Sequence, residues 1–89
     1  MKNTFLKEIS EIELENKIKL HEIWVNSAHK EGKQLQLLCC KIKNVDFSKY
    51  SKLYKDIKIE HSIIEDSSFK SCEFIGCSFK NTELKGIIQ

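Results

Sequence analysis

Apolar residues recur every five positions through the second part of this chain. The period starts at Leu37, slips by two residues near Tyr50 and Ser51, and then continues to Leu84. With hydrophobic residues at 40% of the chain, ten independent matches have a chance of about one in ten thousand. The period of five is therefore not a chance pattern. Its ten centres are Leu37, Ile42, Phe47, Tyr54, Ile59, Ile64, Phe69, Phe74, Phe79 and Leu84.

A second residue accompanies each centre, two positions before it. These residues are mostly small or β-branched: Leu35, Cys40, Val45, Lys52, Ile57, Ser62, Ser67, Cys72, Cys77 and Thr82. In an extended chain, residues two apart share a face, so each pair is expected to point inward together. One inward pair every five residues fits neither the helical period of 3.6 nor the alternation of a hairpin strand. The chain must turn every five residues, although it has no proline and only three glycines.

Four consecutive segments near the C-terminus resemble the pentapeptide-repeat family, whose loose pattern is a small residue, a polar residue, Leu or Phe, and two variable residues. They are Ser67–Ser71, Cys72–Gly76, Cys77–Asn81 and Thr82–Gly86. The stretch from Leu20 to Ser27, with Gly32 and Lys33 after it, also resembles the helix that precedes the repeats in some members. The resemblance implies a mainly β fold, a right-handed quadrilateral β-helix (a pentapeptide-repeat solenoid), and implies no catalytic residues.

Four pentapeptides make one square coil in that family, so ten repeats predict about two and a half coils. Centres one coil apart should stack at the strand spacing of about 4.8 Å. The expected stacks are Leu37 with Ile59 and Phe79, Ile42 with Ile64 and Leu84, Phe47 with Phe69, and Tyr54 with Phe74. The slip should be absorbed at one corner. Because Lys52 occupies a small inward position, we expect the chain to bulge around residues 50–58.

Residues 1–34 carry a helical pattern. The run from Ser10 to Glu13 matches the capping box that begins many helices. Gly32 suits the left-handed position that follows a helix, so the pattern predicts a helix over residues 11–31. Thr4 could cap a short turn before it that brings Phe5, Leu6 and Ile9 to one apolar surface. The residues at helical spacing are Leu14, Ile18, His21, Val25 and Ala28.

Leu20 and Trp24 widen the apolar stripe of this helix. We expect both to pack against the first coil, and His21 to be a buried histidine with its hydrogen bonds satisfied. The chain is therefore predicted to be one structural domain of two parts, an N-terminal helical cap over residues 1–34 and a β-helix over residues 35–89.

The cysteines and histidines give no pattern typical of a metal or catalytic site. Three of the four cysteines, Cys40, Cys72 and Cys77, occupy small inward positions where a thiol fills space, and Cys39 should point outward. Zinc sites use ligand pairs two to four residues apart, which this spacing does not supply. His29 and His61 have no nucleophile or carboxylate at motif spacing. We expect no enzyme activity, metal, cofactor or small-molecule substrate.

Charge and hydropathy exclude several classes of partner. The formal net charge is +2 with both signs interspersed, so no direct binding of nucleic acid is expected. No run of 18 apolar residues is present, and the first eight residues are too charged for a secretory signal. The sequence thus predicts a cytoplasmic protein with no membrane contact and with free thiols.

The two ends of the predicted rod differ, because a helix covers one and nothing comparable follows Leu84. An uncovered sheet edge next to Leu84, Ile87 and Ile88 predicts a homodimer through the C-terminal coil. The function expected is a non-enzymatic protein–protein interaction module with a partner that the sequence does not name. The family resemblance leaves an alternative open: a DNA mimic, or another inhibitor or regulator of a nucleic-acid enzyme such as a bacterial type II topoisomerase.

The inward assignment predicts a clear contrast between neighbouring residues. Phe74→Asp should abolish cooperative thermal unfolding, because a carboxylate at a stacked centre finds no donor to compensate its burial. Glu73→Ala, one position away and outward, should change the free energy of unfolding by less than about 0.5 kcal/mol. Equal effects of the two substitutions in thermal melts followed by circular dichroism would contradict the assignment.

Overall fold

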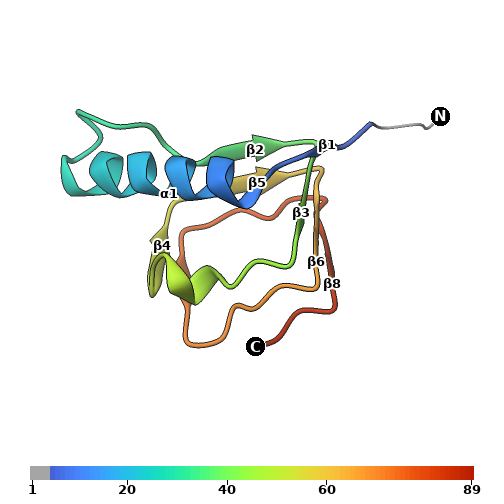
Figure 1. The fold of residues 1–89 in the computed structure, drawn as a ribbon. Coiled ribbons are helices and arrows are strands. Elements are labelled where there is room, and N and C mark those ends of the chain that lie inside the picture. The colour runs from blue at the N-terminus through green and yellow to red at the C-terminus, as the bar shows by residue number, and fades with distance from the viewer. Residues whose placement is uncertain (1–4) are drawn as a thin grey trace.

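The computed structural model describes residues 5–89, and within them it contains one α-helix, one 3-10 turn and eight short strands (Figure 1). The strands form three small sheets, ordered β1-β3-β6-β8, β2-β5 and β4-β7, and every pairing is parallel. The fold is thus mixed α/β. The elements are β1 (Lys7–Glu8), α1 (Glu11–Asn26), β2 (Gln36–Leu38), β3 (Cys40–Lys43), η1 (Phe47–Lys49), β4 (Leu53–Lys55), β5 (Lys58–Glu60), β6 (Ile63–Glu65), β7 (Glu73–Ile75) and β8 (Glu83–Lys85).

From β2 to β7 the chain passes through the three sheets twice in the same order, and β8 then joins the largest sheet; we call each passage through the three sheets a round. The strand register confirms the pairings predicted from the repeat. Opposite residues are Leu37 and Ile59, Ile42 and Ile64, Tyr54 and Phe74, and Ile64 and Leu84. Partners of the first two pairs lie two positions farther apart in the sequence than partners of the last two. The two extra positions correspond to the slip of two residues that the repeat shows near Tyr50 and Ser51.

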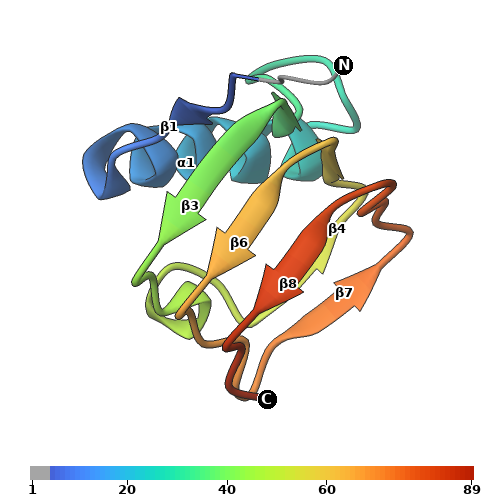
Figure 2. The same ribbon diagram turned by 90° about the vertical axis from the view of Figure 1, so that its right-hand side faces the viewer.

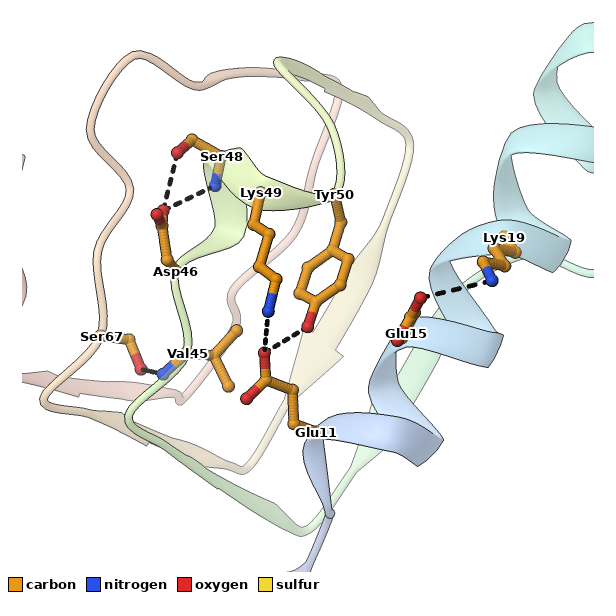
Figure 3. Close-up of polar contacts among 9 residues, drawn as sticks. All are labelled: Glu11, Glu15, Lys19, Val45, Asp46, Ser48, Lys49, Tyr50 and Ser67. Carbon is orange, nitrogen blue, oxygen red and sulfur yellow. Dashed lines mark hydrogen bonds and ion pairs between the residues drawn. The ribbon is translucent and has the colours of Figure 1, made fainter.

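The slip lies at η1, as a local turn. Asp46, before the turn, pairs with Ser68, whereas Leu53, after it, pairs with Glu73, so the separation of partners shortens by two positions between them. Asp46 caps the turn, since its Oδ1 accepts hydrogen bonds from Ser48 Oγ at 2.7 Å and Ser48 N at 3.0 Å, which lower the pKa of the carboxyl (Figure 3). The predicted bulge over residues 50–58 is wrong in extent, because β4 and β5 already pair regularly.

A left-handed residue two positions after each centre turns the chain. Nine of the ten centres in the described residues have one, with φ between 52° and 66°. Phe47 is the exception, because η1 makes the turn that follows it. Asn, Asp and Gly tolerate this conformation best, which explains how the chain turns without proline. The left-handed residues are Cys39, Asn44, Asp56, His61, Asp66, Ser71, Gly76, Asn81 and Gly86.

The inward residues form the core, and burial is deepest from Ile57 to Ile64, between the helical end and the C-terminal strands. Ile57, Ile59 and Ile64 are 0% exposed. Inward hydroxyls satisfy backbone groups where strands end. Ser67 Oγ accepts a hydrogen bond from Val45 N at 3.1 Å (Figure 3), and it donates one to Glu65 O at 3.0 Å. Ser62 bonds Cys40 N and Glu60 O in the same way. Among the small inward positions, Lys52 is exposed, because it lies between η1 and β4, where the regular pairing is interrupted.

The helix begins as predicted and ends earlier. Ser10 Oγ accepts from Glu13 N at 3.1 Å, which completes the N-terminal cap. The C-terminal end is Asn26 instead of residue 31, because Ala28 and His29 take left-handed conformations and reverse the chain. Gly32 does not end the helix. It lies where the returning chain passes the helix, and a Cβ there would stand 2.3 Å from Leu20 O.

The segment before the helix is a strand, which the sequence did not predict. Strand β1 pairs with β3, opposing Lys7 to Cys40. The expected cap Thr4 lies outside the described residues. The expected common apolar surface does not form, because Phe5 is 93% exposed while Ile9 is buried at 6%.

Two substitutions at left-handed turn residues should change the free energy of unfolding in opposite directions. Ser71→Gly should raise the free energy of unfolding, because a left-handed L-residue costs about 1–2 kcal/mol and glycine costs only about 0.5–1 kcal/mol of chain entropy. Gly76→Ala should lower it, since its Cβ would stand 2.5 Å from Asp56 Oδ1. Urea denaturation measures both.

Ser78→Gly is the matched control, because Ser78 lies in an extended region that gains nothing from glycine. Stabilisation by both serine replacements would show that the turn conformation is not the cause.

Candidate functional site

The end of the molecule that carries the helix is covered. Leu14 and Ile18 are 0% and 2% exposed, and His21 is 3% exposed. His21 Nδ1 accepts a hydrogen bond from Leu35 N at 2.9 Å, and its Nε2 lies 2.6 Å from Lys55 O. This arrangement requires the neutral tautomer with its proton on Nε2, which donates to Lys55 O. The prediction of a satisfied, buried histidine is confirmed, and His21 joins the helix to backbone on both sides.

Leu20 and Trp24 do not both pack as predicted. Leu20 is 43% exposed, because Leu14, Ile18 and His21 face the core and Leu20 lies outside their stripe. Trp24 is partly buried, and its ring stacks on His21 at 5.4 Å and on His29 at 3.7 Å between centroids. The left-handed turn at Ala28 and His29 thus folds back to cover the tryptophan. The helix therefore packs on the core through Leu14, Ile18 and His21, and Leu20 lies outside this contact.

A polar contact that the sequence did not reveal joins the start of the helix to the slip (Figure 3). Tyr50 OH donates a hydrogen bond to Glu11 Oε2, and Lys49 Nζ lies 3.6 Å from the same oxygen. Lys49 also stands 5.6 Å from the centroid of the Tyr50 ring. The hydrogen bond to Glu11 raises the pKa of Tyr50 to about 12. The turn made by the two extra residues therefore anchors the helix.

The opposite end of the molecule is open. Figure 2 shows α1 and β1 at one end of the largest sheet and β8 at the other. Along this sheet, Ile42 and Ile64 are 1% and 0% exposed, but Leu84 in the next strand is 46% exposed. Strands β7 and β8 are the last in their sheets. An apolar column therefore reaches the surface at Leu84, beside two unpaired strand edges.

Three phenylalanines in residues 67–89 extend this apolar end. Ring centroids of Phe69 and Phe74 lie 5.0 Å apart, and those of Phe74 and Phe79 lie 5.6 Å apart. All three are partly buried and pack on the core cluster. Phe74 also stacks on Tyr54 at 5.2 Å, with an interplanar angle of 12°. We call Phe69, Phe74, Phe79 and Leu84 the open end.

The residues predicted for a dimer interface lie in different settings. Leu84 belongs to the open end. Ile87 is partly buried against the core, and it follows Val45 and Ser67 in an inward column. Ile88 is 60% exposed and pairs with Ser68, whose own partner is Asp46. Leu84 is therefore part of the open end, Ile87 lies in the core at the same end, and Ile88 lies at its exposed edge.

The thiols are distributed through the rounds. Cys72 Sγ donates to Ser51 O at 3.6 Å, and Cys77 Sγ donates to Tyr54 O at 3.2 Å. Burial raises the pKa of both Cys40 and Cys72. Cys39 is half-buried in a left-handed turn. Among residues 5–89, no group of three His, Cys, Asp or Glu side chains could hold a metal ion.

Comparisons with known proteins add nothing to this geometry, since no family model, curated protein or solved structure matches the chain. In the part of the chain that the structure describes, no helix has both the length and the apolar character needed to cross a membrane.

The contact between Tyr50 and Glu11 predicts a pH-dependent contribution to stability. The pKa of Tyr50 is raised from 10.0 to about 12, so its stabilisation is complete below pH 10 and disappears as the pH rises through 12. Tyr50→Phe should lower the free energy of unfolding at pH 8 by at most about 1 kcal/mol, since the pair is exposed to solvent. Urea melts at pH 8 and pH 12 should show this difference shrinking.

Glu11→Gln provides the control, because the effect of Tyr50→Phe should be smaller in that background. A difference that is independent of pH would exclude the hydrogen bond as its source.

Proposed function

We propose that residues 35–89 form a short right-handed quadrilateral β-helix of the pentapeptide-repeat kind, and that the chain is a non-enzymatic protein–protein interaction module that pairs with a second copy through its open end. The fold proposal is supported by parallel pairing that recurs from round to round and by a left-handed residue after nearly every centre. Figure 1 is in keeping with it, since β2 and β5, β3, β6 and β8, and β4 follow three sides of one outline.

The observation that carries the dimer proposal is the exposure of Leu84. Its neighbours in the same column are at most 1% exposed, whereas Leu84 is 46% exposed at the edge of its sheet. An apolar surface next to unpaired N–H and C=O groups is an aggregation hazard for a single chain. A second copy placed on the open end covers the apolar surface and the strand edges together.

The other end favours a closed dimer over a fibre. Strand β1 is the opposite edge of the largest sheet, and its two residues are Lys7 and Glu8. A short, charged edge strand resists pairing with another sheet. With one end available for contact, a two-fold arrangement uses the same surface of both chains and closes on itself.

The buried hydroxyls support a structural and non-enzymatic role. Ser62 and Ser67 are 3% and 2% exposed, and both hydroxyls donate to a backbone carbonyl and accept from a backbone N–H. A hydroxyl used in this way is not available as a nucleophile. The alternative role, inhibition of a nucleic-acid enzyme such as a type II topoisomerase, stays a prediction of the family resemblance.

The dimer proposal predicts a change in oligomeric state for substitutions at the open end. Ile87→Lys with Ile88→Lys should give monomers of reduced stability, because Ile87 also packs on the core. Leu84→Lys should give monomers that remain folded, since Leu84 is already 46% exposed. Light scattering at tens of micromolar, with circular dichroism for folding, measures both.

Leu38→Lys is the matched control, because Leu38 is 64% exposed on a strand of the first round. It should leave the dimer intact. Cys72 and Cys77 give a second readout, since their alkylation should be slower in the dimer than in the Leu84→Lys monomer. A stable monomer for the unmodified protein would refute the proposal.

A further inference from the structure

Lysines gather on the outer surface of the β2-β5 sheet. Lys58 in β5 stands opposite Gln36 in β2, and the next residue in that row is Ser78. Lys80 lies two residues beyond Ser78, and its carbonyl accepts a hydrogen bond from His61 N at 3.0 Å, which fixes it beside the end of β5. Both Lys58 and Lys80 are exposed.

This surface continues onto the helix. A shallow depression of about 120 Å³ is lined by Lys17 and Leu20 of α1 and by Lys33, Gln34, Leu35 and Gln36. Gln36 belongs to both the depression and the strand pair, so it joins the two regions. We call the combined surface, with Lys17, Lys33, Lys58 and Lys80, the basic face.

The lysines of the basic face differ from those on the largest sheet in their partners. On that sheet each lysine has a carboxylate within 4.0 Å, in the pairs Lys7–Glu13, Lys41–Glu65, Lys43–Glu8 and Lys85–Glu83. Within residues 5–89, none of the four lysines of the basic face has one. The single carboxylate on β2 and β5 is Glu60, which Ser78 Oγ contacts at 3.4 Å. Among the described residues, the basic face therefore carries four lysines without an ion pair and one carboxylate, in a chain whose formal net charge is +2.

Two exposed apolar side chains lie on the same surface, Leu38 opposite Glu60 and Leu20 beside the depression. Leu38 is 64% exposed at the end of β2, and Leu20 is 43% exposed beside the depression. A phosphate backbone would use the lysines and leave both leucines in water. A protein segment with carboxylates and apolar side chains would contact both kinds of residue, as the polar rim and apolar centre of protein interfaces do.

We propose that the basic face binds an acidic protein segment whose apolar side chains contact Leu20 and Leu38. Complementary charge speeds and orients the encounter, and the two leucines lose their exposure to water in the complex. This surface runs along the side of the molecule from the helix to Lys80, which directly follows Phe79 of the open end in the chain.

The test uses a fluorescent peptide that alternates Glu and Leu, with fluorescence anisotropy as the readout. Lys58→Gln with Lys80→Gln should weaken binding about tenfold, since each exposed charge pair contributes modestly. Lys41→Gln with Lys43→Gln, on the neighbouring sheet, should change it less than about twofold. Trp24, the only tryptophan of the chain, lies one helical turn from Leu20 and gives a second, label-free signal.

Two further probes separate the alternatives. A peptide that alternates Glu and Ser should bind more weakly than the Glu and Leu peptide, and an oligothymidine should bind more weakly still. Tighter binding of the oligothymidine, equal losses in both lysine variants, or no binding of any probe would each overturn the proposal. Light scattering of the same variants keeps this result apart from the dimer, because a failed dimer leaves the basic face in place.

Discussion

Parallel backbone pairing between successive rounds is the constraint on which the rest of the structure depends. Every strand is too short to be stable by itself, and each is held by a strand that is distant in the sequence. The turns must therefore repeat with the same geometry, which the left-handed residues provide. Inward hydroxyls complete the pairing at strand ends, as Ser62 does for Cys40 N at 3.0 Å. The apolar centres are buried as a consequence of this register.

A stack of this kind needs both of its ends covered, and the chain covers one. At the helical end, His21 bonds backbone on both sides, and Glu11 holds the turn at Tyr50. At the other end, the inward column that runs through Val45 and Ser67 finishes at Ile87. The same geometry that buries Ile57, Ile59 and Ile64 completely leaves Phe69, Phe74 and Phe79 only partly buried. Stability and the proposed self-association are therefore linked through the fold.

The distribution of charge on the outer surface is set by strand pairing and not by the sequence order of the charged residues. Outward residues of both charges are interspersed along the sequence, which by itself predicts an evenly mixed surface. Strand pairing sorts them by face, because residues one round apart become neighbours. Lys41 meets Glu65 at 3.4 Å on the largest sheet, while Lys58 stands beside Gln36 on the next one. The lysines of the largest sheet are therefore paired with carboxylates, whereas within residues 5–89 the lysines of the basic face are not.

The sequence by itself determined the period of five, the inward residues and the start of the helix at Ser10, because each depends on residues only a few positions apart. The pairing of Tyr54 with Phe74 followed from that period alone. The helix end at Asn26, the strand at Lys7 and Glu8, the exposure of Leu20 and the ion pairing of each face were decided only in the tertiary structure. These features depend on which distant residues become neighbours, and a local pattern carries no information about contacts made across rounds of the chain.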